Sequence, residues 1–95
     1  MAAYVLAQVY GVNDPAGFAD YRSQVTATLA AHGGKFLVRN GTVQVLEGDW
    51  RPVLVILEFS DAEQARSWYD SAAYQRLLEL RQQSAVMELI LVEGV

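Results

Sequence analysis

The sequence predicts an α+β fold with strands and helices in the order β, α, β, β, α, β. Three observations predict it: short segments rich in β-branched and aromatic residues, longer segments whose apolar residues recur every three or four positions, and turn residues between them. All 95 residues are assigned to one domain, residues 1–95, because no linker, repeat or low-complexity tract divides the chain.

The first strand is predicted over residues 3–10, which are followed by the turn residues GVNDP. Asp14 is placed to cap a helix and Pro15 to open it, because a helix start leaves unpaired the N–H that proline lacks. This helix ends near His32, where two glycines favour the left-handed conformation of a C-cap. Its buried face is predicted from residues spaced by three and four positions, Phe18, Tyr21, Val25 and Leu29.

The second strand is predicted over residues 35–39. Asn40 and Gly41 favour a tight hairpin turn with a short return arm, Thr42 to Leu46, and the alternative is a bulge within one longer strand. A loop follows over residues 47–52. The strongest strand signal in the chain is VLVILEF, Val53 to Phe59, which is short, rich in branched residues and bounded by turn residues.

The last helical region begins where Ser60 and Glu63 fit a capping box, in which each side chain satisfies a free backbone N–H. The stretch YDSAAY around Ser71 indicates a break or a second cap before the helical period resumes. Ala65, Trp68 and Ala72 share one helical face. After the break, the helical period is continued by Tyr74, Leu77, Leu78 and Arg81. Residues 87–92 are predicted to close the fold as a final strand.

This order is typical of a ferredoxin-like domain, in which right-handed crossovers place both helical regions on one face of a four-stranded antiparallel sheet. If the other face of the sheet met water, apolar and polar residues should alternate along each strand. Instead, the residues that point to one face and those that point to the other are both apolar. On the first strand the two sets are Val5, Ala7 and Val9 against Tyr4, Leu6 and Tyr10. Because monomers rarely expose so large an apolar patch, the sequence predicts a homodimer that packs sheet on sheet.

The chain resembles the domain-of-unknown-function family numbered 1330 over nearly its whole length, in the segments AYVLAQV, DPAGFADYR, LAAHGGKFLVRNG, VLEGDW, WYDSAAYQRLLELR and LVEGV. That family is similar in fold to the dimeric α/β-barrel proteins, so the resemblance implies the same sheet-to-sheet dimer. Ala72 and Ala73 stand where a proline and an acidic residue are common, which bears on the start of the last helix. The family has no assigned reaction, so the resemblance implies a fold and leaves activity open.

Composition excludes several partners. The net charge is −4 and the seven Lys and Arg residues are scattered, so the sequence predicts neither a nucleic-acid partner nor an anionic membrane surface. No segment approaches the roughly 20 apolar residues that cross a bilayer. Cysteine is absent, which excludes disulfides and thiolate metal sites, and no signal-peptide pattern begins the chain. The expected location is the cytoplasm.

His32 and Glu58 are the candidate catalytic residues. The protonated form of His32 is favoured at a helix C-terminus, where the side chain could act as an acid or base, although a histidine bonded to a nearby carbonyl is the commoner arrangement. Glu58, like Gln8 and Glu88, interrupts an apolar strand, and a buried glutamate could serve as a base. The commoner alternative is a carboxylate that is solvated or paired with an arginine. One histidine without cysteine predicts no metal site.

Aromatic and arginine side chains are the candidate ligand-binding residues. The aromatic rings could line a pocket between sheet and helices, with phenol groups orienting an aromatic or enone-like ligand, although aromatic residues at helical spacing are more often core. Arg39 is placed to hold an anionic group, while Trp50 lies in a polar loop where it could cover a partner subunit. The full predicted set comprises Arg39, Tyr21, Trp68, Tyr69, Tyr74 and Arg81.

The leading functional hypothesis is therefore a small dimeric domain that binds a small organic molecule in a sheet-to-helix pocket. A cofactor-free isomerisation, cyclisation or oxygenation, with His32 as acid or base and Tyr74 orienting the ligand, follows only by analogy with the wider fold. The alternative is a non-catalytic binding or interaction module whose dimer is itself the functional object. We expect no cofactor in either case.

Overall fold

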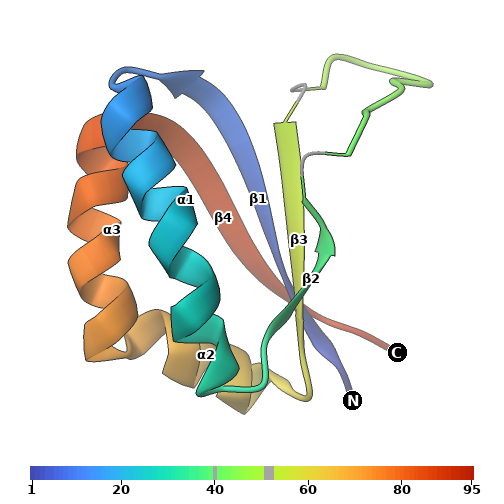
Figure 1. Ribbon diagram of the computed structural model, residues 1–95. Helices are drawn as coiled ribbons and strands as arrows, with labels where there is room; N and C mark the ends of the chain where they lie inside the picture. Colours follow the sequence, from blue (N-terminus) through green and yellow to red (C-terminus); the bar gives the residue numbers. More distant parts are fainter. Residues whose placement is uncertain (40, 51–52) are drawn as a thin grey trace.

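The computed structural model describes residues 1–39, 41–50 and 53–95. Four strands and three helices follow one another in the predicted order, with the second helical region divided in two (Figure 1). The elements are β1 (Ala3–Val12), α1 (Pro15–Ala30), β2 (Lys35–Val38), β3 (Val53–Phe59), α2 (Ala62–Asp70), α3 (Ala72–Ser84) and β4 (Ala85–Glu93).

The strands form one antiparallel sheet in the order β2-β3-β1-β4, and Figure 1 shows the helices together on one face of it. The central strand β1 pairs with β3 and β4, so that Val5 lies between Leu57 and Leu91, and Leu6 lies between Ile56 and Ile90. This is the ferredoxin-like fold that the sequence predicts. The predicted alternation of β1 is also confirmed, because every second side chain from Ala3 to Val9 is buried.

Both helical regions begin at aspartates. The Asp14 carboxylate accepts a hydrogen bond from the Gly17 backbone N–H, and Pro15 opens α1, as predicted. At the start of α2, Asp61 is the cap in place of the predicted Ser60. Its backbone is extended and its carboxylate accepts a 2.8 Å hydrogen bond from the Gln64 N–H, because the helix starts one residue later than a capping box at Ser60 requires.

Ser71 divides the second helical region, as the sequence predicts. Its ψ of 147° is incompatible with a helix, so it ends α2 and caps α3 at once. The Ser71 hydroxyl donates to the Trp68 carbonyl oxygen at 2.7 Å and accepts from the Tyr74 N–H at 3.2 Å. One side chain therefore serves two helix ends and fixes the angle between them.

The predicted return arm, Thr42 to Leu46, is wrong. These residues form no strand, and almost all of them are exposed. A strand here would have only β2 as its partner, and a two-stranded ribbon without a packed face is marginal in water. Asn40, on which the choice between hairpin turn and bulge depends, and residues 51–52 of the predicted loop lie outside the described residues.

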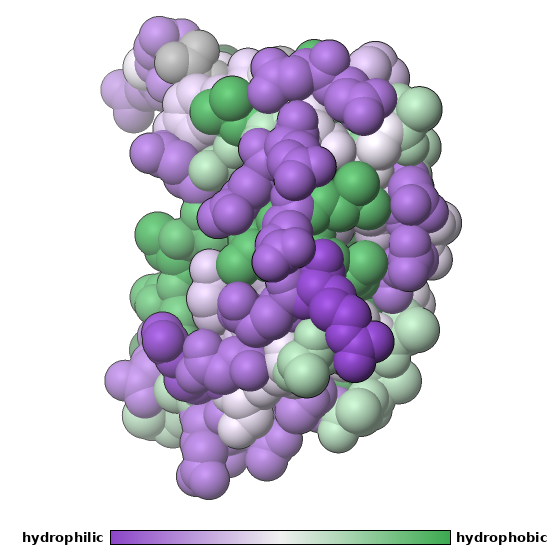
Figure 2. Space-filling model, turned by 90° about the vertical axis from the view of Figure 1, so that its left-hand side faces the viewer, coloured by the Kyte–Doolittle hydropathy of each residue, from purple (hydrophilic) through white to green (hydrophobic). Residues whose placement is uncertain are grey.

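The core lies between the helices and the sheet. Its most deeply buried large side chains are Trp68, Tyr74, Phe59 and Leu29. The side of the molecule formed by α1 and α3 carries mainly hydrophilic residues (Figure 2). The opposite face of the sheet, which we call the open face, instead exposes aliphatic side chains, among them Val86 (54% exposed), Ile90 (59%) and Val92 (43%). Within the described ranges, no helix is long and apolar enough to cross a membrane.

Candidate functional site

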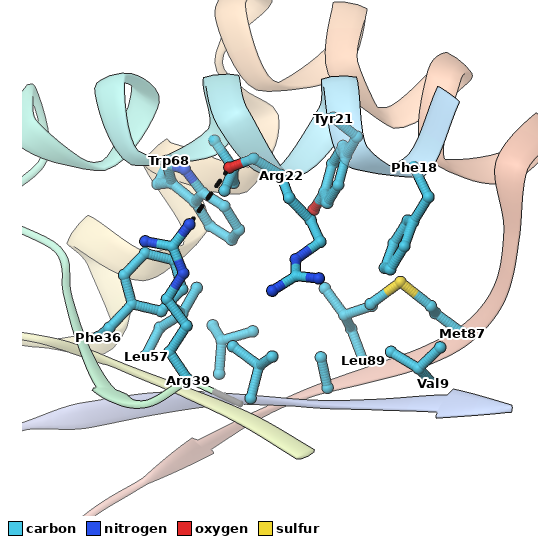
Figure 3. A pocket seen from close by; sticks show the side chains of 14 residues that line it. Val9, Phe18, Tyr21, Arg22, Phe36, Arg39, Leu57, Trp68, Met87 and Leu89 are labelled. Carbon is cyan, nitrogen blue, oxygen red and sulfur yellow. Dashed lines mark hydrogen bonds between the residues drawn. The ribbon is translucent and has the colours of Figure 1, made fainter. Parts of the chain in front are cut away.

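A cavity of about 70 Å³ lies between α1 and the helix-covered face of the sheet (Figure 3). Its floor is built from alternate residues of β1, β3 and β4, because side chains two apart on a strand point to the same face. Its walls come from α1, from Trp68 of α2, from Phe36 within β2 and from Arg39 directly after that strand. The floor residues include Val5, Ala7, Val9, Val55, Leu57 and Leu89.

Arg39 stands on one wall of this cavity. Its guanidinium carbon lies 4.5 Å from the centroid of the Phe36 ring, a cation–π distance. Its terminal nitrogens donate long, 3.5 Å hydrogen bonds to the Thr26 hydroxyl and to the Arg22 carbonyl oxygen, the second of which is drawn in Figure 3. These contacts hold the end of β2 against α1 and leave donor capacity on the guanidinium, which has five N–H groups.

Arg22 is the second cation of the cavity, and Figure 3 shows its side chain reaching from α1 into the space above the sheet. Its guanidinium carbon lies 5.9 Å from the centroid of Phe18. Among the described residues that line the cavity there is no carboxylate. Two guanidinium groups therefore flank an apolar space without a protein anion to neutralise them there.

Tyr21 lines the cavity and donates to, or accepts from, the buried Tyr74 hydroxyl at 3.0 Å. Burial raises the pKa of Tyr21 far above that of a free phenol, and the adjoining Tyr74 hydroxyl adds to the rise. Burial likewise raises the pKa of Tyr74. Both phenols therefore stay neutral over the physiological pH range and act as hydrogen-bond donors and acceptors.

Trp68 forms the wall at the α2 end. Its indole N–H donates to the Thr28 hydroxyl at 2.9 Å, and that hydroxyl donates to the Val25 carbonyl at 2.6 Å, so the ring is fixed to α1. The ring packs on Tyr74, with 4.2 Å between centroids, and on Phe59 at 5.5 Å. Trp68 thus joins the cavity to the aromatic core.

The structure brings three of the eight predicted site residues to the cavity, namely Tyr21, Arg39 and Trp68. Tyr74 and Arg81 lie behind the wall, and Tyr69 meets Trp68 edge to face without lining the cavity. Arg81 is only 7% exposed and one of its terminal nitrogens, Nη1, has no hydrogen-bond partner among the described residues.

His32 and Glu58 lie away from the cavity. His32 follows the end of α1, where its backbone N–H donates to the Leu29 carbonyl, and its side chain is not part of the lining. Glu58 projects from the open face and pairs with Lys35 at 3.1 Å. Their roles as acid and base stay predictions that this cavity does not use.

Sequence reasoning missed Arg22. The signal was present, because Arg22 follows Phe18 by four positions and precedes Val25 by three, which puts it on the flank of the predicted apolar stripe. A flanking arginine is ordinarily a solvated residue, and only the fold shows that β2 leaves room for it to turn inward. Across the residues that the structure describes, no cluster of His, Cys, Asp or Glu is suited to hold a metal ion.

Comparison with known proteins gives a family and a fold. The family described as "Domain of unknown function (DUF1330)" matches residues 2–95. No curated protein matches the chain. Among solved structures, a protein of unknown function from Rhodopseudomonas palustris is similar, with a TM-score of 0.77 and 16% identity over 99% of this chain and 82% of that one.

Two further structures share the fold. SnoaB from Streptomyces nogalater, a cofactor-independent oxygenase, has a TM-score of 0.63 and 19% identity over 99% of this chain and 92% of its own. A dimeric ferredoxin-like protein of unknown function from Jannaschia sp. CCS1 has a TM-score of 0.64 and 14% identity over 99% of this chain and 100% of its own. Identities this low establish the ferredoxin-like fold and leave the chemistry to the residues of this chain.

Proposed function

The chain belongs to the DUF1330 family of domains of unknown function, and we propose that it binds a small organic anion in the cavity between α1 and the sheet. The observation that carries the proposal is the pair Arg22 and Arg39, which flank an apolar space whose described lining holds no carboxylate. A guanidinium beside apolar walls is stabilised by an anion, and a carboxylate offers the matching bidentate geometry. The apolar walls accept the body of the ligand.

The cavity is too small to admit a ligand unless one of its side chains moves. About 70 Å³ is small beside the several hundred Å³ of typical ligand pockets. Arg22 takes up part of the space, since its long side chain enters it from α1 (Figure 3). A ligand would therefore enter only when the Arg22 side chain moves aside. The Arg22 guanidinium would then pair with the anionic group of the ligand at the edge of the cavity.

We further propose that two copies pair through the open face. Burying a fully exposed aliphatic side chain contributes about 1.5–3 kcal/mol, so each of these half-exposed side chains stabilises an interface by roughly half of that before the entropy of association is subtracted. The helical side, by contrast, is mainly hydrophilic (Figure 2). The dimeric neighbour from Jannaschia sp. CCS1 supports this arrangement.

Binding is proposed in preference to catalysis because of what the cavity contains. Its described lining has no imidazole and no carboxylate, so any proton transfer would depend on Tyr21, whose pKa burial raises. The oxygenase SnoaB supports a cofactor-free reaction only through its fold. A non-catalytic ligand-binding module fits these residues with fewer assumptions.

A matched pair of probes tests the proposal, benzoate and benzyl alcohol, which share the ring and differ in charge. Each is titrated into ¹⁵N-labelled protein and followed by amide shifts. Benzoate is expected to shift amides of α1 and β2, and benzyl alcohol to bind at least about tenfold more weakly, the size expected for a charge-assisted hydrogen bond.

Arg22→Gln and Arg39→Gln should each weaken benzoate binding by about tenfold. Arg76→Gln, which removes the same charge from an exposed position of α3, should leave it unchanged. Equal binding of both probes, or equal loss in all three variants, would exclude a specific anion site.

A further inference from the structure

The hydroxyl pair of Tyr21 and Tyr74 holds one more hydrogen-bond donor than the protein uses. Each phenol has one O–H, and the 3.0 Å contact between the two oxygens consumes one of them. Neither hydroxyl has another partner among the described residues. One buried O–H is therefore left without an acceptor, in a place where an unmade hydrogen bond costs about 1–3 kcal/mol.

The surroundings decide where the spare O–H can find an acceptor. Tyr74 is fully buried, its ring lies against Trp68 and Tyr69, and the described residues supply no second acceptor for its hydroxyl. The positive charge of Arg81 acts on the pKa of both tyrosines in the same direction, so it does not decide which hydroxyl donates.

Either hydroxyl can be the donor, and when Tyr74 donates to Tyr21 the spare O–H belongs to the tyrosine that lines the cavity, where a ligand oxygen can accept it. Tyr21 is the member of the pair that lines the cavity, and Figure 3 shows its side chain extending from α1 toward the sheet. In the same cavity Arg22 and Arg39 supply the cationic groups.

We infer that the Tyr21 hydroxyl donates a hydrogen bond to a neutral oxygen of the ligand, so that the ligand is an apolar acid that also carries a carbonyl group. This inference rests on the proposed anion site and adds a second polar contact to it. Tyr74 does not touch the ligand in this arrangement, and its O–H only occupies one acceptor position of the Tyr21 oxygen.

The test compares benzoate with its 2-, 3- and 4-acetyl derivatives, which add a carbonyl at three directions from the carboxylate. Affinities are measured by amide shifts on the full chain. One isomer is expected to bind about fivefold more tightly than benzoate, the size of one neutral hydrogen bond. In Tyr21→Phe that isomer should bind no better than benzoate binds to the same variant.

Tyr74→Phe is the matched control, since it removes the other hydroxyl of the same hydrogen bond and leaves the Tyr21 O–H in place. It should keep the preference for the acetyl isomer, and the amide spectra of both variants report whether each is folded. If Tyr74→Phe abolishes the preference and Tyr21→Phe keeps it, the assignment to Tyr21 is overturned.

If all three isomers bind no better than benzoate, the carbonyl inference fails and the anion site stands. If benzoate itself does not bind, the proposed function fails first.

Discussion

At the scale of single residues, close contacts decide which positions tolerate change. Gly34 shows this most directly. A Cβ at this position would lie 2.6 Å from Cε1 of Phe59 and 3.0 Å from Cδ2 of Leu29, both of which are buried in the core. The residue therefore lets the chain leave α1 directly over the core, where a side chain would not fit.

Gly34→Ala is expected to lower the free energy of unfolding by about 1–3 kcal/mol, because the ring of Phe59 cannot move without disturbing the core. Urea unfolding at fixed protein concentration measures this loss. Gly11→Ala, where an added Cβ meets nothing within 4 Å, should change the free energy by less than about 0.5 kcal/mol. Equal losses at both positions would contradict the packing argument.

The buried tyrosines make stability depend on pH in the alkaline range. Burial raises the pKa of Tyr21 and Tyr74, whereas both return to about 10 in the unfolded chain. The unfolded state therefore loses protons first, and the stability that these neutral phenols contribute is complete below pH 10 and falls as the pH rises above it.

Tyr21→Phe should flatten the decline of stability above pH 10, measured by urea unfolding between pH 8 and about pH 11. A slope that is unchanged in Tyr21→Phe would show that ionisation of other groups governs alkaline unfolding.

At the scale of elements, α2 and α3 depend on the residue between them. Ser71→Ala removes the hydrogen bonds that its hydroxyl makes to both helices and is expected to lower the free energy of unfolding by about 1–2 kcal/mol. Ser67→Ala, on the exposed side of α2, is the control and should have little effect. Thermal and urea unfolding compare the two, and an equally small loss at Ser71 would show that the cap is dispensable.

Helices and strands whose spacing of apolar residues agrees with their burial in the fold could be predicted from the sequence. Features that depend on contacts between distant segments could not. The stripe of α1, the break at Ser71 and the two-sided strand β3 follow from local residues that agree with the fold. Residues 42–46 have strand-like side chains but no neighbouring strand to pair with, which only the tertiary structure reveals. The cavity could not be predicted from the local sequence either, because Arg22 and Arg39 are seventeen positions apart and meet only when β2 packs beside α1.

At the scale of the whole molecule, the open face predicts the state of assembly. Ile90 is 59% exposed in the single chain and lies on the edge strand β4, where it pairs with Leu6 of the interior strand β1 on that face. A charge at this position would be buried without a partner in a sheet-to-sheet dimer, which is strongly unfavourable, yet it would be solvated in a monomer.

Ile90→Asp is therefore expected to give a folded monomer, or to weaken dimerisation by at least about a hundredfold, in sedimentation equilibrium experiments. Ala19→Asp, on the exposed side of α1, adds the same charge to the hydrophilic side and should leave the dimer intact. An unmodified protein that sediments as a monomer at micromolar concentration would overturn the prediction.

The two ends of the chain are joined by a hydrogen bond, from the Gly94 N–H to the Ala2 carbonyl oxygen at 2.8 Å. A linker of a few glycines could therefore close the polypeptide into a ring without disturbing β1 or β4. New chain ends could then be opened within residues 41–50, which form neither a strand nor a helix. Such a circular permutant should keep the native fold, and it would carry a fluorescent label on the exposed segment instead of beside the central strand.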